Sequence, residues 1–184
     1  MLEPNFSPFT EIKTERLLLR CLKKSDAPTL LFLRSDETVM QYIDREKPKT
    51  LDEAEGFVLI VLETLEKNEG IMWAICLKNE PEKLIGTIGY WRFLNQHYRA
   101  EVGYMLNPNQ WNKGIMKEAL LAVVDFGFKV IKLHSIEAHI NPENIASGIL
   151  LKKAGFTREA YFKEDFYFRG KFINTAVYSL LNKS

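Results

Sequence analysis

The chain has 184 residues, which suits one domain with a full hydrophobic core. Its 25 Lys and Arg residues nearly balance 24 Asp and Glu residues, so the overall charge gives no reason to expect binding to nucleic acid or to an anionic membrane. The N-terminus lacks a basic segment followed by an apolar core, and no apolar run approaches the roughly 20 residues of a membrane span. We therefore expect a cytoplasmic protein.

Neither the cysteines nor the histidines indicate a metal site. Cys21 and Cys76 both lie in apolar segments, which favours reduced, buried thiols over a disulfide framework or a metal cluster. The three histidines are scattered, and none has the four-residue spacing of two metal ligands on one helix. We expect no bound metal, and the sequence leaves both a monomer and a homodimer open.

The first third of the chain predicts an arm, a strand and two helices. Residues 1–13 show no periodicity and should form an arm that leads into a single domain at residues 14–182. Residues 16–21 form a short apolar strand, and a capping residue followed by proline starts the helix after it. Thr50 opens a capping box for a second helix, which runs through Leu65.

Strands and one long helix make up most of the remainder. We predict strands at 71–77, 84–93 and 98–106, a helix from about Lys113 to Ile131, a strand at 135–140, a short helix that starts with Pro142 at its first position and ends at Gly155, and a closing hairpin of 162–168 and 172–180. The first three strands have short connections, so they should form an antiparallel meander. The long helix is a crossover, which makes the strands at 98–106 and 135–140 parallel if they share a sheet.

The turn before the long helix is a candidate ligand site. The first N–H groups of a helix lack internal partners, and the helix dipole adds roughly half a positive charge there. Residues 112–116 can therefore bind an anion. Gly114 would let a ligand approach the backbone closely, although a tight turn without a ligand also explains a lone glycine. The Walker and dinucleotide motifs do not fit, because a single glycine follows the lysine and Ile-Met comes next.

The segment from Trp111 to Leu120 reads Trp-Asn-Lys-Gly-Ile-Met-Lys-Glu-Ala-Leu. It resembles the pyrophosphate-binding loop of the Gcn5-related N-acetyltransferases, the GNAT family. The closest resemblance is to the branch that acetylates the N-termini of ribosomal proteins, in which Trp-Gly-Lys-Gly-Tyr-Ala-Thr-Glu-Ala-Leu is typical. Asn112 and Met116 stand where small residues are usual. The resemblance implies that acetyl-coenzyme A (acetyl-CoA) binds at Trp111, Asn112, Lys113, Gly114, Ile115 and Met116.

Glu101 lies in a strand with mainly apolar neighbours, where a buried carboxylate needs a partner or an upward shift in its pKa. A glutamate at the rim, paired with Arg99 or a lysine, is the structural explanation. Residues 100–104 also match the family's Ala-Glu-Ile-Gly-Tyr with one conservative change, which implies that Glu101 is the base that takes the amine proton. The resemblance further implies that Met105 and Leu106 bind the cofactor, with a backbone N–H near Met105 polarising the thioester carbonyl.

Residues 141–147 read Asn-Pro-Glu-Asn-Ile-Ala-Ser and resemble the family's Asn-Pro-Glu-Asn-x-Ala-Ser segment. The resemblance implies that Asn144 contacts the pantetheine arm and that Ser147 lies near the thioester sulfur, whereas a solvated helix serine is the plain alternative. Many members protonate the leaving thiolate with a tyrosine four residues before a Gly-Phe pair, and that position is Leu151 here. The acid role would therefore fall to Ser147 or to water.

Two aromatic residues, Tyr42 and Phe57, fall in the region that borders the acceptor pocket in this family. The resemblance implies that they bind the acceptor together with Glu101. Packing in the core or on the surface remains the usual role of a single aromatic side chain.

The resemblance covers nearly the whole chain and implies an α/β (α+β) fold. This fold is a mixed, mostly antiparallel twisted sheet with flanking helices and a parallel strand pair that splays at the cofactor site. The implied reaction is acetyl transfer from acetyl-CoA to a primary amine, which we expect to be a protein or peptide N-terminal α-amine. A small-molecule acetyltransferase acting on an antibiotic or polyamine, and a non-catalytic acetyl-CoA-binding module, are the alternatives. We expect neither nucleic acid nor a membrane as a partner.

Overall fold

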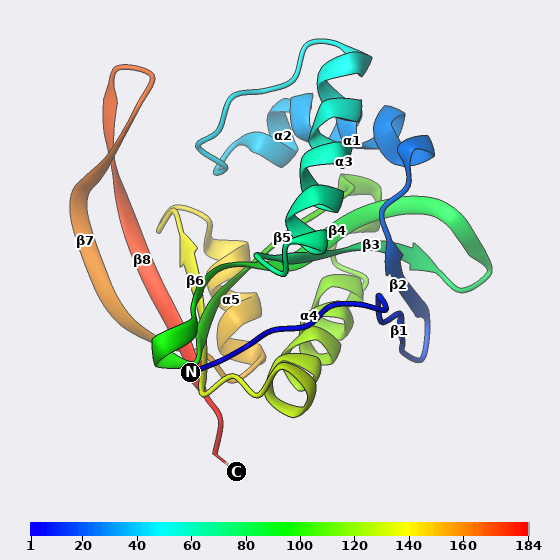
Figure 1. Cartoon of the computed structure of the whole chain (residues 1–184). Helices are drawn as coiled ribbons and strands as arrows, with labels where there is room; N and C mark the ends of the chain where they lie inside the picture. Colours follow the sequence, from blue (N-terminus) through cyan, green and yellow to red (C-terminus); the bar gives the residue numbers. More distant parts are fainter. Residues whose placement is uncertain (184) are drawn as a thin grey trace.

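Eight strands form one sheet in the computed structural model, which describes residues 1–183 (Figure 1). The strands are β1 (Ile12–Lys13), β2 (Leu17–Cys21), β3 (Ile71–Leu77), β4 (Glu80–Leu94), β5 (Arg99–Leu106), β6 (Ser135–Ile140), β7 (Thr157–Phe168) and β8 (Lys171–Leu181). Their order in the sheet is β1-β2-β3-β4-β5-β6-β8-β7. Every neighbouring pair is antiparallel except β5 and β6, which are parallel. The predicted mixed, mostly antiparallel sheet is therefore confirmed.

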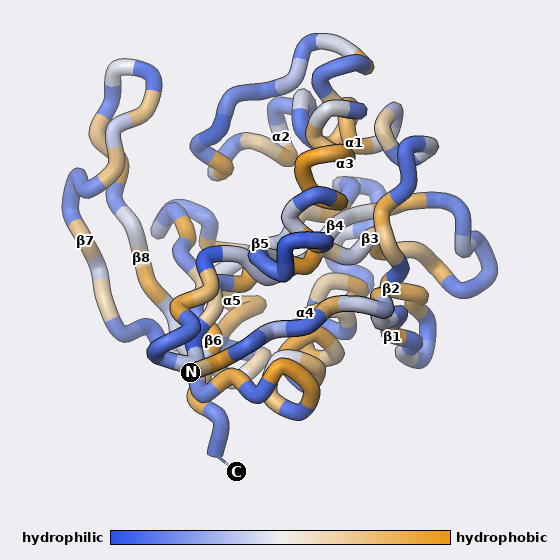
Figure 2. Tube along the Cα trace, viewed as in Figure 1, coloured by the Kyte–Doolittle hydropathy of each residue, from blue (hydrophilic) through white to orange (hydrophobic). Residues whose placement is uncertain are grey.

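Helices cover both faces of this sheet (Figure 1). They are α1 (Ala27–Ser35), α2 (Glu37–Met40), α3 (Leu51–Glu66), α4 (Ile115–Phe126) and α5 (Ile145–Lys153), and α4 continues through a π-helical turn at Gly127–Ile131. Buried residues of α4 and α5 share one core cluster with the sheet, and those of α1 and α3 share a second cluster. The segment between α2 and α3 is mainly hydrophilic (Figure 2). In the described part of the chain, no helix is long and apolar enough to cross a membrane.

Two strands begin earlier than the sequence predicts. β4 starts at Glu80 instead of residue 84, and β7 starts at Thr157 instead of residue 162. Both extensions consist mostly of exposed residues, so they lack the apolar alternation on which the prediction depends. They are strands because their backbone pairs with a neighbour, as in the pairing of Glu80 with Leu77.

The N-terminal segment packs against the domain. Leu2 and Phe6 are buried in the core cluster of α4 and α5, and the Phe6 N–H donates to Asn68 Oδ1 at 2.8 Å. Trp73 Nε1 donates to the Thr10 carbonyl at 2.9 Å. The segment predicted to be an arm therefore supplies part of the core.

The parallel pair is short, and this creates an opening in the sheet. β5 and β6 are in register only from Arg99 and Ser135 to Glu101 and Glu137. Beyond these residues β5 stays paired with β4 as far as Leu106, while β6 stays paired with β8 as far as Ile140. The two strands thus diverge toward their carboxyl ends, where α4 begins.

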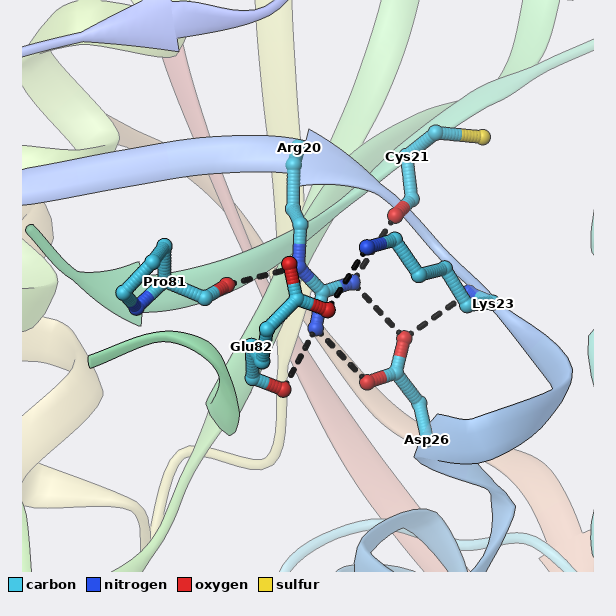
Figure 3. A network of polar contacts seen from close by, with 6 residues as sticks. All are labelled: Arg20, Cys21, Lys23, Asp26, Pro81 and Glu82. Atoms are coloured by element: carbon cyan, nitrogen blue, oxygen red, sulfur yellow. Dashed lines mark hydrogen bonds and ion pairs between the residues drawn. The ribbon is translucent and has the colours of Figure 1, made fainter.

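A buried ion pair anchors β2 to the start of α1 (Figure 3). Arg20 and Asp26 are each 3% exposed, and two hydrogen bonds of 2.8 Å join the guanidinium to the carboxylate. The sequence places Asp26 at a helix start, but its side chain makes no capping bond there and instead accepts from Arg20 and from the Lys23 N–H. The remaining Arg20 donors bond to carbonyls of Cys21, Pro81 and Glu82, so the buried charge is fully paired.

Replacing Asp26 with Asn should lower the free energy of unfolding by about 3 kcal/mol, because it leaves the buried Arg20 charge without its counter-ion. The measurement is urea denaturation at neutral pH. Glu82→Gln is the control, since it breaks the exposed Lys23–Glu82 pair and should leave the unfolding midpoint unchanged. Equal midpoints for the two variants would contradict a stabilising role for the buried pair.

Candidate active site

The start of α4 presents unpaired backbone donors beside the end of β5. Gly114 is the N-cap with φ of 75°, and Asn112 also has a positive φ of 59°. The first bond of the helix runs from the Glu118 N–H to the Gly114 carbonyl at 3.1 Å. Within residues 1–183, the N–H groups from Lys113 to Met116 have no acceptor. These groups and the helix dipole can bind an anion.

Glu118 fixes this turn to the β1–β2 connection. Its carboxylate accepts from Arg16 Nε at 2.7 Å, from the Arg16 N–H at 2.8 Å and from the Thr14 hydroxyl. Arg16 also donates to the Lys113 carbonyl at 2.9 Å. Burial raises the pKa of Glu118, but these hydrogen bonds outweigh it and lower the pKa overall. The sequence motif includes Glu118 but does not reveal this bracing role, because its partners lie about 100 residues earlier.

Met116 does not obstruct the turn. Its side chain is 9% exposed, that of Ile115 is 3% exposed, and both belong to the core cluster of α4 and α5. Because both side chains pack in the core, a ligand at the turn would meet the backbone of these residues. Trp111 lies at the surface, where its Nε1 donates to the Leu106 carbonyl at 2.8 Å and joins the turn to the end of β5.

The other wall of the opening is the start of α5. This helix starts later than the sequence predicts, because Asn144 is its N-cap and accepts through Oδ1 from the Ser147 N–H at 3.0 Å. Ser147 is 6% exposed, and its Oγ lies 2.6 Å from the Tyr104 hydroxyl. Burial raises the pKa of Tyr104 to about 12, although the bond to Ser147 opposes the shift, so the phenol is neutral near pH 7. The sequence prediction assigns no role to Tyr104, yet this residue joins β5 to α5 across the opening.

The pairing of β5 with β4 decides which backbone groups face the opening. The Asn107 N–H donates to the Ile85 carbonyl at 2.8 Å, and Met105 lies opposite Thr87. Hydrogen bonds alternate along an antiparallel pair, so the N–H of Met105 points toward β4 and that of Leu106 points toward β6. Of the two residues expected to bind the cofactor here, Leu106 is therefore the one whose N–H faces the opening.

Glu101 lies on the opposite face of the sheet from Ser147. Successive strand residues face opposite sides, and Met105 packs in the α1 and α3 cluster while Leu106 packs in the other. Glu101 is 8% exposed, and its Oε2 lies 3.0 Å from Arg92 Nη1. The suggested partner Arg99 bonds to Glu137 instead.

A bulge explains why Arg92 reaches Glu101. Arg92 has a positive φ of 48°, and the β4–β5 register shifts after Trp91. Such a bulge redirects a side chain, which the residue alternation in the sequence does not reveal. Glu101 Oε1 has no partner within the described chain, so it is available as an acceptor.

A cavity of about 250 Å³ lies on the same face as Glu101. Phe57 of α3, Met72 of β3, Trp91 of β4 and Arg45 are among its lining residues. Trp91 is the register partner of Glu101. Phe57 therefore lines a cavity that adjoins Glu101 through Trp91, whereas Glu101 and Tyr42 are not among the lining residues.

Gly103 makes room for the wall of this cavity. A Cβ atom at this position would clash with the Trp91 ring. The glycine in the strand motif is thus required by close packing against an aromatic ring.

Comparison with known proteins identifies the family. Residues 16–157 match the family described as "Acetyltransferase (GNAT) domain". The chain belongs to the GNAT acetyltransferase family. This GNAT chain is therefore an acetyl-CoA-dependent N-acetyltransferase. Within residues 1–183, no three His, Cys, Asp or Glu side chains gather in a group that could hold a metal ion.

Three similar proteins illustrate the family. The uncharacterized N-acetyltransferase YoaA of Bacillus subtilis is 32% identical over 94% of this chain and 97% of its own length. The crystal structure of ribosomal-protein-S5-alanine acetyltransferase from Vibrio fischeri is 27% identical, with a TM-score of 0.83, and the match covers 95% of this chain and 97% of that one. Spermidine N(1)-acetyltransferase of Vibrio cholerae is 24% identical over 85% of this chain and 88% of its own length. The acceptors named for the last two proteins differ: one is a ribosomal protein and the other is spermidine.

Met116→Ala should lower the free energy of unfolding by about 2–4 kcal/mol, because it opens a cavity in the core. Saturating acetyl-CoA should raise the melting temperature of the variant as much as that of the wild type, because the backbone donors are unchanged. Thermal denaturation with and without acetyl-CoA measures both effects. A much smaller cofactor-induced rise in the variant would place the Met116 side chain at the ligand.

Proposed function

We propose that this GNAT enzyme acetylates the α-amino group at the N-terminus of a protein or peptide, as in the ribosomal-protein branch. The observation that supports this acceptor most directly is the cavity beside Glu101. Its walls combine the aromatic rings of Phe57 and Trp91 with the positive charge of Arg45, and its lining includes no carboxylate. Such a surface suits the side chains of a peptide and repels a polycation.

The main alternative is a polyamine acceptor, which the similarity to a spermidine acetyltransferase favours. A polyamine carries several positive charges and needs carboxylates to balance them. Glu101 lies on the same face of the sheet as the cavity, and it is already paired with Arg92. Two features favour the non-catalytic alternative: the bulky Met116 in the loop and Leu151 at the position of the family's tyrosine. The first is weakened, because Met116 is buried in the core.

In the proposed mechanism, each face of the sheet serves one substrate. The N–H groups from Lys113 to Met116 bind the diphosphate of acetyl-CoA, with Trp111 and Asn112 at the edge of the turn, and Asn144 contacts the pantetheine arm. The Leu106 N–H polarises the thioester carbonyl. The acceptor enters from the α1 and α3 face, where Phe57 and Glu101 lie and where Tyr42 remains a candidate contact.

Glu101 Oε1 takes a proton from the acceptor ammonium, directly or through water. The neutral amine then attacks the thioester carbon, the C–N bond forms, the C–S bond breaks, and the second proton lost by the nitrogen ends on the departing thiolate. This base can deprotonate an α-amine more easily than a lysine side chain, because the pKa of an α-amine is about 7.7–8.0 and that of a lysine side chain is about 10.4. The Ser147 hydroxyl donates a hydrogen bond to the departing thiolate, and Tyr104 orients that hydroxyl.

The test of this function is a comparison of kcat/KM for peptides with free N-termini, an N-terminally blocked peptide with one lysine, and spermidine. We expect the free N-termini to be acetylated fastest. Glu101→Gln should reduce that rate by about 10²- to 10⁴-fold, most strongly below pH 7.5, where the α-amine is mostly protonated. Faster acetylation of spermidine than of every peptide would overturn the proposed acceptor.

Ser147→Ala should reduce kcat by about 10- to 10³-fold with little change in the affinity for acetyl-CoA, because the lost hydrogen bond forms only as the thiolate departs. Tyr104→Phe should reduce kcat by less. The double variant should be no slower than Ser147→Ala, since Tyr104 acts through Ser147. Steady-state kinetics of the three variants form the test, and fully multiplicative effects would mean that the two hydroxyls act independently.

A further inference from the structure

Two arginines on the acceptor side of the sheet have no counter-ion among the described residues. The chain has eight arginines, and five of them form ion pairs with carboxylates: Arg16, Arg20, Arg92, Arg99 and Arg169. Arg34 and Arg45 form none within residues 1–183 and instead lie over aromatic rings. The Arg34 guanidinium is 3.9 Å from the centre of the Phe57 ring, and the Arg45 guanidinium is 5.1 Å from that of Trp91. Both of these rings line the cavity beside Glu101.

The two guanidinium groups are close enough to repel each other. Burial lowers the pKa of Arg34, and the nearby charge of Arg45 lowers it further. The indole N–H of Trp91 is also buried without an acceptor in the described part of the chain. Arg45 is exposed and lines the cavity, and the partly buried Arg34 lies against its Phe57 wall, so both cations are accessible to a ligand. The buried indole N–H adds a donor that no protein acceptor satisfies in the described chain, which is costly unless water or a ligand completes it.

The acidic residues of the adjoining segment do not supply the missing acceptor. Glu37 pairs with Lys47, and Glu46 pairs with Arg169 at the tip of the β7–β8 hairpin. Asp44 forms no ion pair among the described residues, and burial raises its pKa. These three acidic residues thus leave Arg45 without an ion pair in the described part of the chain.

We propose that Arg34 and Arg45 bind a carboxylate of the acceptor, so that the enzyme prefers peptide N-termini with Asp or Glu among the first residues. This inference rests on the proposed function, because the same cavity receives the peptide. Guanidinium groups form strong, directional hydrogen bonds with carboxylates. A carboxylate bound at Arg45 would lie close to the reacting amine. Arg45 lies over the Trp91 ring, and Trp91 is the register partner of Glu101, the proposed base.

The experiment compares pairs of C-terminally amidated peptides that carry Asp or Asn at residue 1, 2 or 3. The wild type should acetylate the Asp peptide of at least one pair with kcat/KM about 10- to 100-fold higher, as expected for a charge-assisted hydrogen bond. Arg45→Gln and Arg34→Gln should each reduce that preference at least several-fold. Arg158→Gln is the matched control, since Arg158 is exposed on β7, far along the chain from the cavity wall, and forms no ion pair among the described residues; it should keep the preference.

A second arm needs no turnover. The N-acetylated forms of the same peptides are titrated against wild type and both variants while tryptophan fluorescence is followed. Tighter binding of the Asp form by the wild type alone supports the inference even if no peptide is acetylated, an outcome that would overturn only the proposed acceptor. Equal affinity of the wild type for the Asp and Asn forms in every pair, or a preference that survives both substitutions, overturns the arginine site.

Discussion

The divergence of β5 and β6 is the constraint on which the site depends. The two strands are in register for three residue pairs, and each then follows its antiparallel neighbour. Backbone groups at the end of β5 therefore lose a strand partner on one side. The helix that follows β5 begins at the same edge, where its first N–H groups also lack acceptors. Unpaired backbone donors are unfavourable in a folded protein unless water or a ligand completes them, so this edge is suited to an extended, anionic ligand.

The alternation of β5 assigns the chemistry to two faces. Tyr104 and Leu106 face α4 and α5, whereas Glu101 and Met105 face the layer of α1 and α3. A base on one face and hydroxyl groups on the other can act on opposite sides of one reacting carbon without competing for space. This arrangement suits direct attack by the amine while both substrates are bound, and it needs no acyl-enzyme intermediate.

Features set by local sequence are the ones that could be predicted. The periodicity of residues 115–126 indicates α4, and the crossover that it forms makes β5 and β6 parallel. Features set by long-range contacts could not be predicted. The bond between Tyr104 and Ser147 joins residues 43 apart, and the Arg92–Glu101 pair needs a bulge that no residue pattern marks. Asp26 stands at a helix start and accepts from the Lys23 N–H, but its second role as the partner of the buried Arg20 is not visible in the local sequence.

In the proposed function, the choice of acceptor depends on the local charge of the cavity and not on the total charge of the chain. The chain has a net charge of +1, which by itself predicts no ionic partner. Most of its arginines are neutralised within the protein, so the few that are not determine the field in the acceptor cavity. These residues lie in α1 and in the segment before α3, outside the helix starts and the end of β5 that bind acetyl-CoA in the proposed mechanism. The sheet can therefore support the same reaction while substitutions in these two segments change which acceptor binds. For this reason a shared fold does not identify the substrate.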